Sequence, residues 1–233
     1  MTRAVFFDVD FTLIYPGPTF RGEGYQQFCA RHGIAVDPAR FDAAVANASA
    51  ILDEAQNHIY EAALFHRYTA TIVRGMGGEG PNVDRCAEEM YEEWAACRHF
   101  ELYDDVPATL RAIAARDIRI GLISNSHRCL ASFQSHFELE GLIAATVSSS
   151  EHGYMKPHPS IFEAALRLAG VPASDAVMVG DSLAHDIEGG RRVGMRGVLV
   201  RRSADIGPSS ASRLDIDQDV PVIRSLTELP ALL

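Results

Sequence analysis

The segment Ala4-Val5-Phe6-Phe7-Asp8-Val9-Asp10-Phe11-Thr12-Leu13 decides the fold of this chain. Its first four residues are apolar, and they predict a strand that is buried on both faces. Two carboxylates, Asp8 and Asp10, follow at once. A charge at the rim of a core is costly unless a cation or another partner lies beside it. A lone Asp-x-Asp is also typical of a helix-capping turn, so its interpretation depends on the rest of the chain.

Composition sets the broad class. The chain has 233 residues, which is enough for one sizeable α/β domain or for a domain plus a smaller insert. Hydrophobic residues make up 47% and charged residues 22%, which is ordinary for a soluble globular protein. Its net charge of −10 argues against nucleic acid or an anionic membrane as the main partner. The four cysteines form no CxxC pair, which indicates reduced thiols.

The chain also lacks a hydrophobic stretch long enough to span a bilayer. The first strand follows directly on Met1-Thr2-Arg3, which does not resemble a signal peptide. We therefore expect a cytoplasmic protein, as a monomer or a homodimer.

Strands and helices alternate along most of the chain, which predicts a parallel sheet with right-handed crossovers. Beyond the first strand, we expect strands at 118–123, 144–147, 176–179, 197–200 and 220–223. We expect helices at 107–115, with Asp104 or Asp105 as the cap, and at 128–137, 160–169 and 187–193.

One segment departs from this alternation. From about Glu23 to Arg98 the apolar residues recur at helical spacing, and one such set is Ile51, Leu52 and Ala55. We expect an all-helical insert of about four helices over 16–100.

The polar residues gather where strands are expected to end. In an open parallel sheet, ligands bind beyond the carboxyl ends of the strands. Any one of these groups could cap a helix, but together they indicate a site. The groups are Asp8 and Asp10, Ser124-Asn125-Ser126, Lys156 on the loop after the third strand, and Gly180-Asp181-Ser182 with Asp186.

Lys156 is the only lysine among the 21 basic residues, and all the rest are arginines. A compact ammonium group fits a tight pocket that would exclude a planar guanidinium.

These residues suit phosphoryl transfer. Asp8, Asp10 and Asp181 offer hard oxygen ligands, which favour Mg²⁺. Asp8 could attack phosphorus to give an aspartyl-phosphate, with Asp10 as acid and then base. Ser124 and Asn125 would bind the phosphate oxygens, so we expect a small phosphorylated metabolite as the partner.

The four motifs resemble those of the haloacid dehalogenase-like hydrolases, in the right order along the whole chain. They are Asp8-Val9-Asp10-Phe11-Thr12-Leu13, Ser124-Asn125, Lys156-Pro157 and Gly180-Asp181-Ser182-Leu183-Ala184-His185-Asp186. The resemblance implies a Rossmann-like core of 1–15 plus 101–233 and an inserted helical cap of 16–100.

The resemblance also implies roles. Asp8 is the expected nucleophile, Asp10 the acid/base, and Ser124 a phosphate ligand. Lys156 would hold the phosphate and Asp8. Asp181 would ligate Mg²⁺ with the Asp8 carboxylate and the Asp10 main-chain carbonyl, and Asp186 would support the metal.

Within the family, a carboxylate at Asp10 favours a Mg²⁺-dependent phosphatase over a dehalogenase. A sugar-phosphate mutase and a non-catalytic binding protein stay open as alternatives. Phe11 stands where the family usually has Gly, which could alter the turn or narrow the pocket.

Overall fold

The computed structural model describes residues 1–202 and 219–233. Its described residues form two compact units: unit 1, with residues 1–15, 102–202 and 219–233, and unit 2, with residues 16–101. The part of the predicted core at 203–218 lies outside the described residues. No helix of the described residues is both long and apolar enough to cross a membrane.

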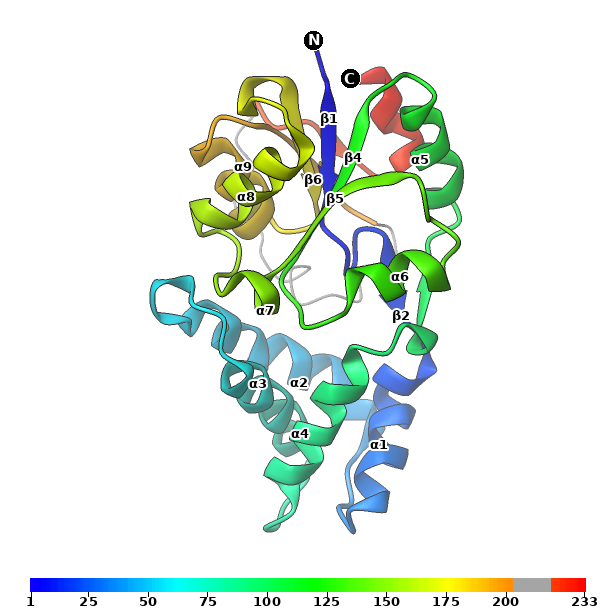
Figure 1. The fold of residues 1–233 in the computed structure, drawn as a ribbon. Helices are drawn as coiled ribbons and strands as arrows, with labels where there is room; N and C mark the ends of the chain where they lie inside the picture. The colour runs from blue at the N-terminus through cyan, green and yellow to red at the C-terminus, as the bar shows by residue number, and fades with distance from the viewer. Residues whose placement is uncertain (203–218) are drawn as a thin grey trace. The chain divides into compact units, whose positions relative to one another are not determined.

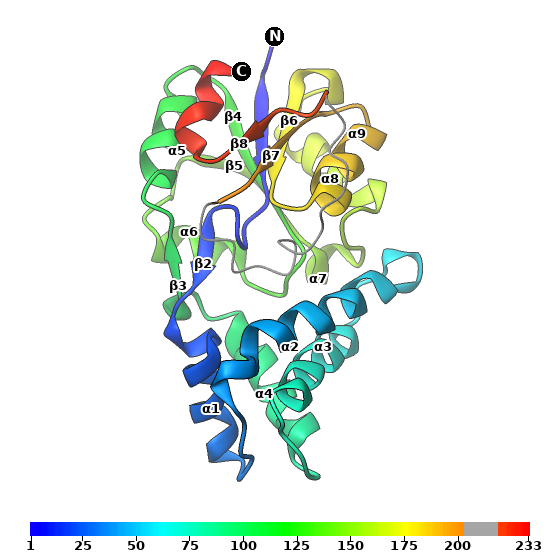
Figure 2. The same ribbon diagram turned by 180° about the vertical axis from the view of Figure 1, so that it is seen from behind.

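Unit 1 is built on a six-stranded sheet in the order β5-β4-β1-β6-β7-β8 (Figures 1 and 2). Every pairing in it is parallel, so the predicted α/β parallel fold is confirmed. The strands are β1 (Ala4–Phe7), β4 (Arg119–Ser124), β5 (Ile143–Ser148), β6 (Ala176–Gly180), β7 (Arg196–Val200) and β8 (Val222–Ile223).

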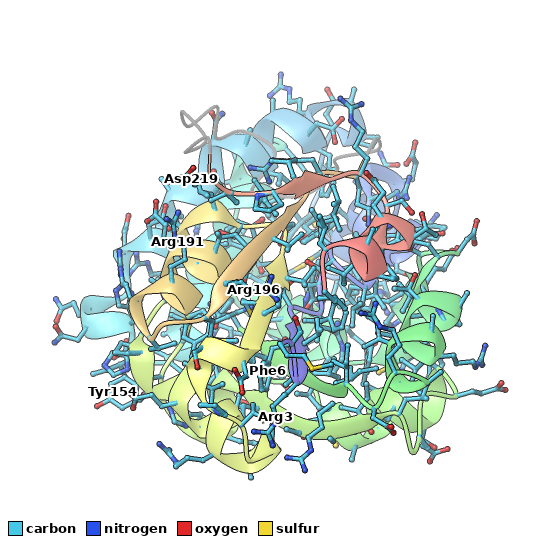
Figure 3. All side chains as sticks on the ribbon, turned by 90° about the horizontal axis from the view of Figure 1, so that it is seen from above. Arg3, Phe6, Tyr154, Arg191, Arg196 and Asp219 are labelled. Carbon is cyan, nitrogen blue, oxygen red and sulfur yellow. The ribbon has the colours of Figure 1, made fainter. Side chains whose placement is uncertain are left out.

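The strand β1 lies between β4 and β6, and all four of its residues are buried. Phe6 pairs in register with Gly121 on one side and Met178 on the other. A Cβ at Gly121 would lie 2.4 Å from the Phe6 ring, so this glycine makes room for the aromatic side chain. Figure 3 shows Phe6 on β1 among the surrounding strands and helices. The opening apolar run is therefore the centre of the sheet.

Helices cover both faces of this sheet (Figures 1 and 2). On one face, α8 (Pro159–Ala169) packs Ile161 and Phe162 against β1, β4, β5 and β6. On the other, α5 (Val106–Ala114) lies beside the final 3-10 helix, Leu226–Ala231. The remaining helices of unit 1 are α6 (Leu130–His136), α7 (Ser149–His152) and α9 (Gly189–Arg192).

Two details of unit 1 differ from the sequence-based expectation. The helix expected at 187–193 begins earlier, as a π-helix over Leu183–Glu188, and continues as α9. Asp105 stands at the N-cap position of α5, but its side chain makes no capping hydrogen bond. Its Oδ2 instead accepts hydrogen bonds from Arg202 at 2.6 Å and from Ser225 at 2.7 Å.

Unit 2 is helical, with α1 (Gly22–Arg31), α2 (Phe41–Ala48), α3 (Ala62–Gly75) and α4 (Val83–Trp94). Short 3-10 helices lie at Pro18–Phe20, Pro38–Arg40, Ser49–Glu54, Gln56–His58 and Cys97–His99. The helix expected around Ile51 is wrong, because this stretch is a 3-10 helix with no buried residue. The α-helix precedes it and buries Phe41 and small alanines, which pack against α3.

The chain passes between the units through β2 (Ile14–Pro16) and β3 (Phe100–Leu102), which pair as a separate two-stranded sheet. Just inside unit 2, the Gly17 N–H donates to the His99 carbonyl at 2.8 Å. Just inside unit 1, the Tyr103 N–H donates to the Leu13 carbonyl at 3.1 Å. The chain thus leaves unit 1 and returns to it at adjacent points.

Candidate active site

The predicted site residues follow the carboxyl ends of three neighbouring strands. Asp8 comes directly after β1, Ser124 ends β4, and Asp181 comes directly after β6. Because β4, β1 and β6 are parallel neighbours, these ends meet at one edge of the sheet. The backbone of Asp8 is fixed there by its N–H, which donates to the Val179 carbonyl at 2.9 Å.

Lys156 lies at the centre of this edge. Its ammonium nitrogen is 2.6 Å from Asp8 Oδ1, 2.7 Å from Asp186 Oδ1 and 2.8 Å from the Ile123 carbonyl oxygen. The ammonium group forms hydrogen bonds to Asp8 and to the Ile123 carbonyl, and it forms an ion pair with Asp186. This arrangement gives a physical reason for a lysine in a chain that otherwise uses arginine.

Asn125 holds the backbone of Lys156. Its Oδ1 accepts from the Lys156 N–H at 2.7 Å, and its Nδ2 donates to the Lys156 carbonyl at 3.0 Å. These two contacts leave the second N–H of Nδ2, together with the backbone N–H of Asn125, as donors that a phosphate could use. Ser124 is fully buried, with its Oγ 2.8 Å from Ser126 Oγ.

Burial raises the pKa of Asp8 well above its ordinary value, and the nearby carboxylates of Asp186 and Asp181 add to this, while Lys156 opposes it. Burial alone would lower the pKa of Lys156, but the charges of Asp186 and Asp8 outweigh it and raise that pKa. The ammonium group is thus held in its charged form by the two carboxylates. A further cation beside Asp8 would favour its ionised form in the same way.

Three carboxylates could hold a metal ion. One oxygen from each of Asp8, Asp181 and Asp186 can be chosen so that all three lie within 4.8 Å of one another. Asp8 and Asp186 are buried, and three carboxylates so close repel one another unless cations offset them. Oxygen-only ligands fit a hard divalent cation such as Mg²⁺. The donor set therefore fits the metal expected from the sequence.

The π-helix and Gly180 bring Asp186 into this group. The Ser182 N–H donates to Asp186 Oδ2 at 3.0 Å. A Cβ at Gly180 would lie 2.2 Å from the same oxygen, so only glycine leaves room for the carboxylate. π-helical turns of this kind are frequent at functional sites.

Asp10 is bound differently. Both of its carboxylate oxygens contact one nitrogen of Arg128: Nη1 lies 2.9 Å from Oδ1 and 3.1 Å from Oδ2. Arg128 is not among the residues predicted from the sequence, because arginine is the general surface cation of this chain. Its place in the turn after Ser124-Asn125-Ser126, at the expected edge of the sheet, was the signal that could have found it.

Phe11 adopts a left-handed backbone conformation, with φ at +65°. This region favours glycine, because a Cβ there approaches the backbone too closely. The structure thus gives a physical reason for the glycine that the resemblance leads one to expect at this position.

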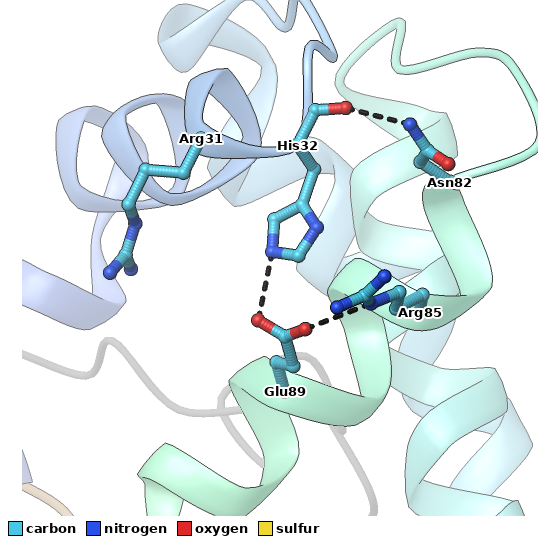
Figure 4. A pocket seen from close by; sticks show the side chains of 5 residues that line it. All are labelled: Arg31, His32, Asn82, Arg85 and Glu89. Atoms are coloured by element: carbon cyan, nitrogen blue, oxygen red, sulfur yellow. Dashed lines mark hydrogen bonds and ion pairs between the residues drawn. The ribbon is translucent and has the colours of Figure 1, made fainter.

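Unit 2 has a hollow of its own of about 380 Å³, lined by Arg31, His32, Asn82, Arg85 and Glu89 (Figure 4). Within it, Glu89 lies 3.1 Å from both His32 Nε2 and Arg85 Nε. Glu89 is the one carboxylate among these lining residues, so this hollow does not match the chemistry of the carboxylate cluster in unit 1.

The chain belongs to the haloacid dehalogenase-like hydrolases (HAD): the sequence model of this family matches residues 2–194. The family and the enzyme class predicted from the motifs are confirmed, and the chain is a hydrolase of this family.

Named relatives agree with this assignment. The chain is 32% identical over 151 residues to haloacid dehalogenase-like hydrolase domain-containing protein 3 of Danio rerio, an alignment that covers 65% of this chain and 60% of that protein. It is 31% identical over 256 residues to the N-acylneuraminate-9-phosphatase of Homo sapiens, covering 99% of this chain and 93% of the relative.

A solved structure shows the same fold. The HAD-hydrolase YfnB of Bacillus subtilis, in a magnesium-bound crystal form, superposes with a TM-score of 0.72 at 16% identity. The match covers 100% of this chain and 98% of that one.

Proposed function

We propose that this protein is a Mg²⁺-dependent phosphatase that hydrolyses a small phosphomonoester through an aspartyl-phosphate on Asp8. The observation that carries the proposal is the contact of Lys156 with both Asp8 and Asp186, beside a third carboxylate, Asp181. A buried nucleophilic carboxylate, a fixed cation and a set of hard ligands are what phosphoryl transfer needs at one place.

Asp8, Asp181 and Asp186 would hold the metal through their carboxylates, and Asp10 through its main-chain carbonyl. When bound, Mg²⁺ supplies positive charge that offsets the carboxylates and the phosphate oxygens. The use of magnesium in the structure of YfnB supports this choice of cation.

In the first step, an oxygen of the Asp8 carboxylate forms a bond to phosphorus while the ester P–O bond breaks. Asp10 gives a proton to the departing oxygen. In the second step, Asp10 takes a proton from water, the water oxygen attacks phosphorus, and inorganic phosphate leaves with Asp8 restored. Lys156 and Ser124 bind the phosphate oxygens during both steps, with the backbone N–H of Asn125 as a further donor.

The substrate class is a phosphorylated small metabolite. Because the chain resembles N-acylneuraminate-9-phosphatase over nearly its full length, the phosphate ester of a sugar acid is the first candidate. We further propose that unit 2 is the cap that selects the leaving group. The cytoplasmic location and the monomeric or homodimeric state stay predictions.

Release of inorganic phosphate from a panel of esters tests the proposal. The panel contains N-acylneuraminate 9-phosphate, phosphoglycolate, hexose phosphates and nucleoside monophosphates, each with Mg²⁺ and with EDTA. We expect Mg²⁺-dependent release that disappears in Asp8→Asn. Absence of release from every ester, or release that persists in Asp8→Asn, would contradict it.

A further inference from the structure

Arg128 is the largest fully buried side chain among the described residues, with 1% of its surface exposed. Its guanidinium is always charged, and taking such a group out of water costs several kcal/mol unless a partner offsets the cost. The partner is the Asp10 carboxylate, 118 residues away in the sequence. A buried cation at this position therefore calls for a reason beyond packing.

The contact with Arg128 fixes the orientation of the Asp10 carboxylate. Because one nitrogen, Nη1, lies within 3.1 Å of both oxygens, rotation of the Asp10 side chain would break at least one contact. An ionised carboxylate has about four lone-pair sites, so two N–H contacts leave others for a proton. The contact is thus compatible with proton transfer by Asp10.

Arg128 is itself held in place. Its backbone N–H donates to Ser126 Oγ at 3.4 Å, and Ser126 Oγ lies 2.8 Å from Ser124 Oγ. The backbone of Arg128 is therefore linked, through Ser126, to the Ser124 hydroxyl that we propose to bind phosphate. This chain of contacts links the positions of Ser124 and Asp10.

We propose that Arg128 is a positioning residue that holds the Asp10 carboxylate for proton transfer to and from the reacting oxygens. The inference rests on the proposed phosphatase function. Asp10 is the fourth carboxylate at an edge that already gathers Asp8, Asp181 and Asp186, and charge repulsion would otherwise favour its turning towards solvent. Arg128 offsets that repulsion and limits the rotamers of Asp10, which keeps the proton donor within reach.

Two esters with different leaving groups test this inference. An alkyl phosphate such as glycerol 3-phosphate needs a proton on its leaving oxygen, whereas the nitrophenolate of p-nitrophenyl phosphate leaves without one. The parameter to compare is kcat/KM, because it reports the step in which the phosphoryl group is transferred to Asp8. We expect Arg128→Met to lower kcat/KM by roughly 10²-fold for the alkyl ester and by clearly less for the aryl ester. Arg128→Lys, which keeps a charge nearby, should retain part of the alkyl activity.

A double-mutant cycle separates positioning from a purely structural role. If Arg128 acts through Asp10, then adding Arg128→Met to Asp10→Asn should cause little further loss. The control is Arg3→Met, which breaks another Arg–Asp pair, 3.8 Å from Asp175 and beside the first residues of β1 and β6, and should leave the ratio between the two esters unchanged.

Equal losses for the two esters, or losses that add to those of Asp10→Asn, would overturn the inference and leave the phosphatase standing. If Arg128→Met does not fold, as thermal unfolding would show, the same comparison is made with Arg128→Lys. A wild-type protein that releases phosphate from neither ester nor from the panel would overturn the proposed function, and the inference with it.

Discussion

Lys156 Nζ and Asp8 Oδ1 lie 2.6 Å apart, although 148 residues separate them in the sequence. The same nitrogen lies 2.7 Å from Asp186 Oδ1, so one buried ammonium group forms ion pairs with two buried carboxylates. Loss of this cation would leave both negative charges in a site that water hardly reaches.

Lys156→Met should therefore lower the free energy of unfolding by about 3–5 kcal/mol, which is the usual cost of removing one partner from a buried ion pair. Chemical denaturation in EDTA measures it. Lys156→Met/Asp8→Asn, with one carboxylate fewer, should recover part of the loss. A single variant as stable as the wild type would contradict the role of the ammonium group.

Mg²⁺ should stabilise the folded protein. At a concentration near 100 times its Kd, a ligand that binds only the folded state adds about 2.7 kcal/mol. Thermal unfolding with Mg²⁺ and with EDTA measures the shift, which should vanish in Asp181→Asn. The control is Asp175→Asn, which alters a surface aspartate paired with Arg3 and should keep the shift. A shift unchanged in Asp181→Asn would remove this residue from the metal site.

Gly180→Ala should displace Asp186, since the added Cβ would lie 2.2 Å from its Oδ2. We expect stability to fall by about 1–3 kcal/mol, the usual cost of overpacking, and the Mg²⁺ shift to shrink. Adding Asp186→Ala removes the clash, so the double variant should lose less stability than the two single effects together. Denaturation of the four proteins of this cycle provides the measurement.

The left-handed backbone of Phe11 predicts that two small replacements differ in stability. Phe11→Gly and Phe11→Ala both remove the aromatic ring, but only glycine tolerates a φ of +65° without strain. Phe11→Gly should therefore be more stable than Phe11→Ala by about 1 kcal/mol. The difference between their denaturation midpoints tests this, and an alanine variant equal to the glycine variant would show that the backbone relaxes.

Asp105 predicts an acid-dependent contribution to stability. Burial alone would raise the pKa of Asp105, but hydrogen bonds from Arg202 and Ser225 outweigh it and hold the pKa below its ordinary value. The unfolded chain then binds a proton more readily than the folded one, so the contribution is full above about pH 4 and declines as the pH falls below it. The stability advantage over Asp105→Asn should follow this decline, as denaturation at several pH values would show.

Much of the fold follows from the sequence, because its signals are local and repeated. The apolar run Ala4–Phe7 predicts a buried strand, which the structure confirms, and the alternation after it predicts a parallel sheet. Polar residues at three strand ends then place Asp8, Ser124 and Asp181 at one edge. Lys156 is conspicuous in the sequence alone, because it is the single lysine in a chain of arginines.

Other features depend on contacts that the sequence does not show. Arg128 resembles any surface arginine until the turn after β4 buries it against Asp10. In the sequence Asp105 resembles a helix cap, yet its carboxylate accepts hydrogen bonds from Arg202 and from the first backbone N–H of the final helix. The π-helix at Leu183–Glu188 has no signal in the sequence that distinguishes it from an α-helix.

The paired strands β2 and β3 have a consequence for the design of variants. The Tyr103 N–H donates a hydrogen bond to the Leu13 carbonyl within unit 1. The two chain ends that would be left by removing residues 16–101 are therefore close together. A short turn could join them without moving β1 or β4. A helical segment from another chain could therefore be inserted at the same two points. The register of β1 and β6, whose ends carry the carboxylates, would not have to change.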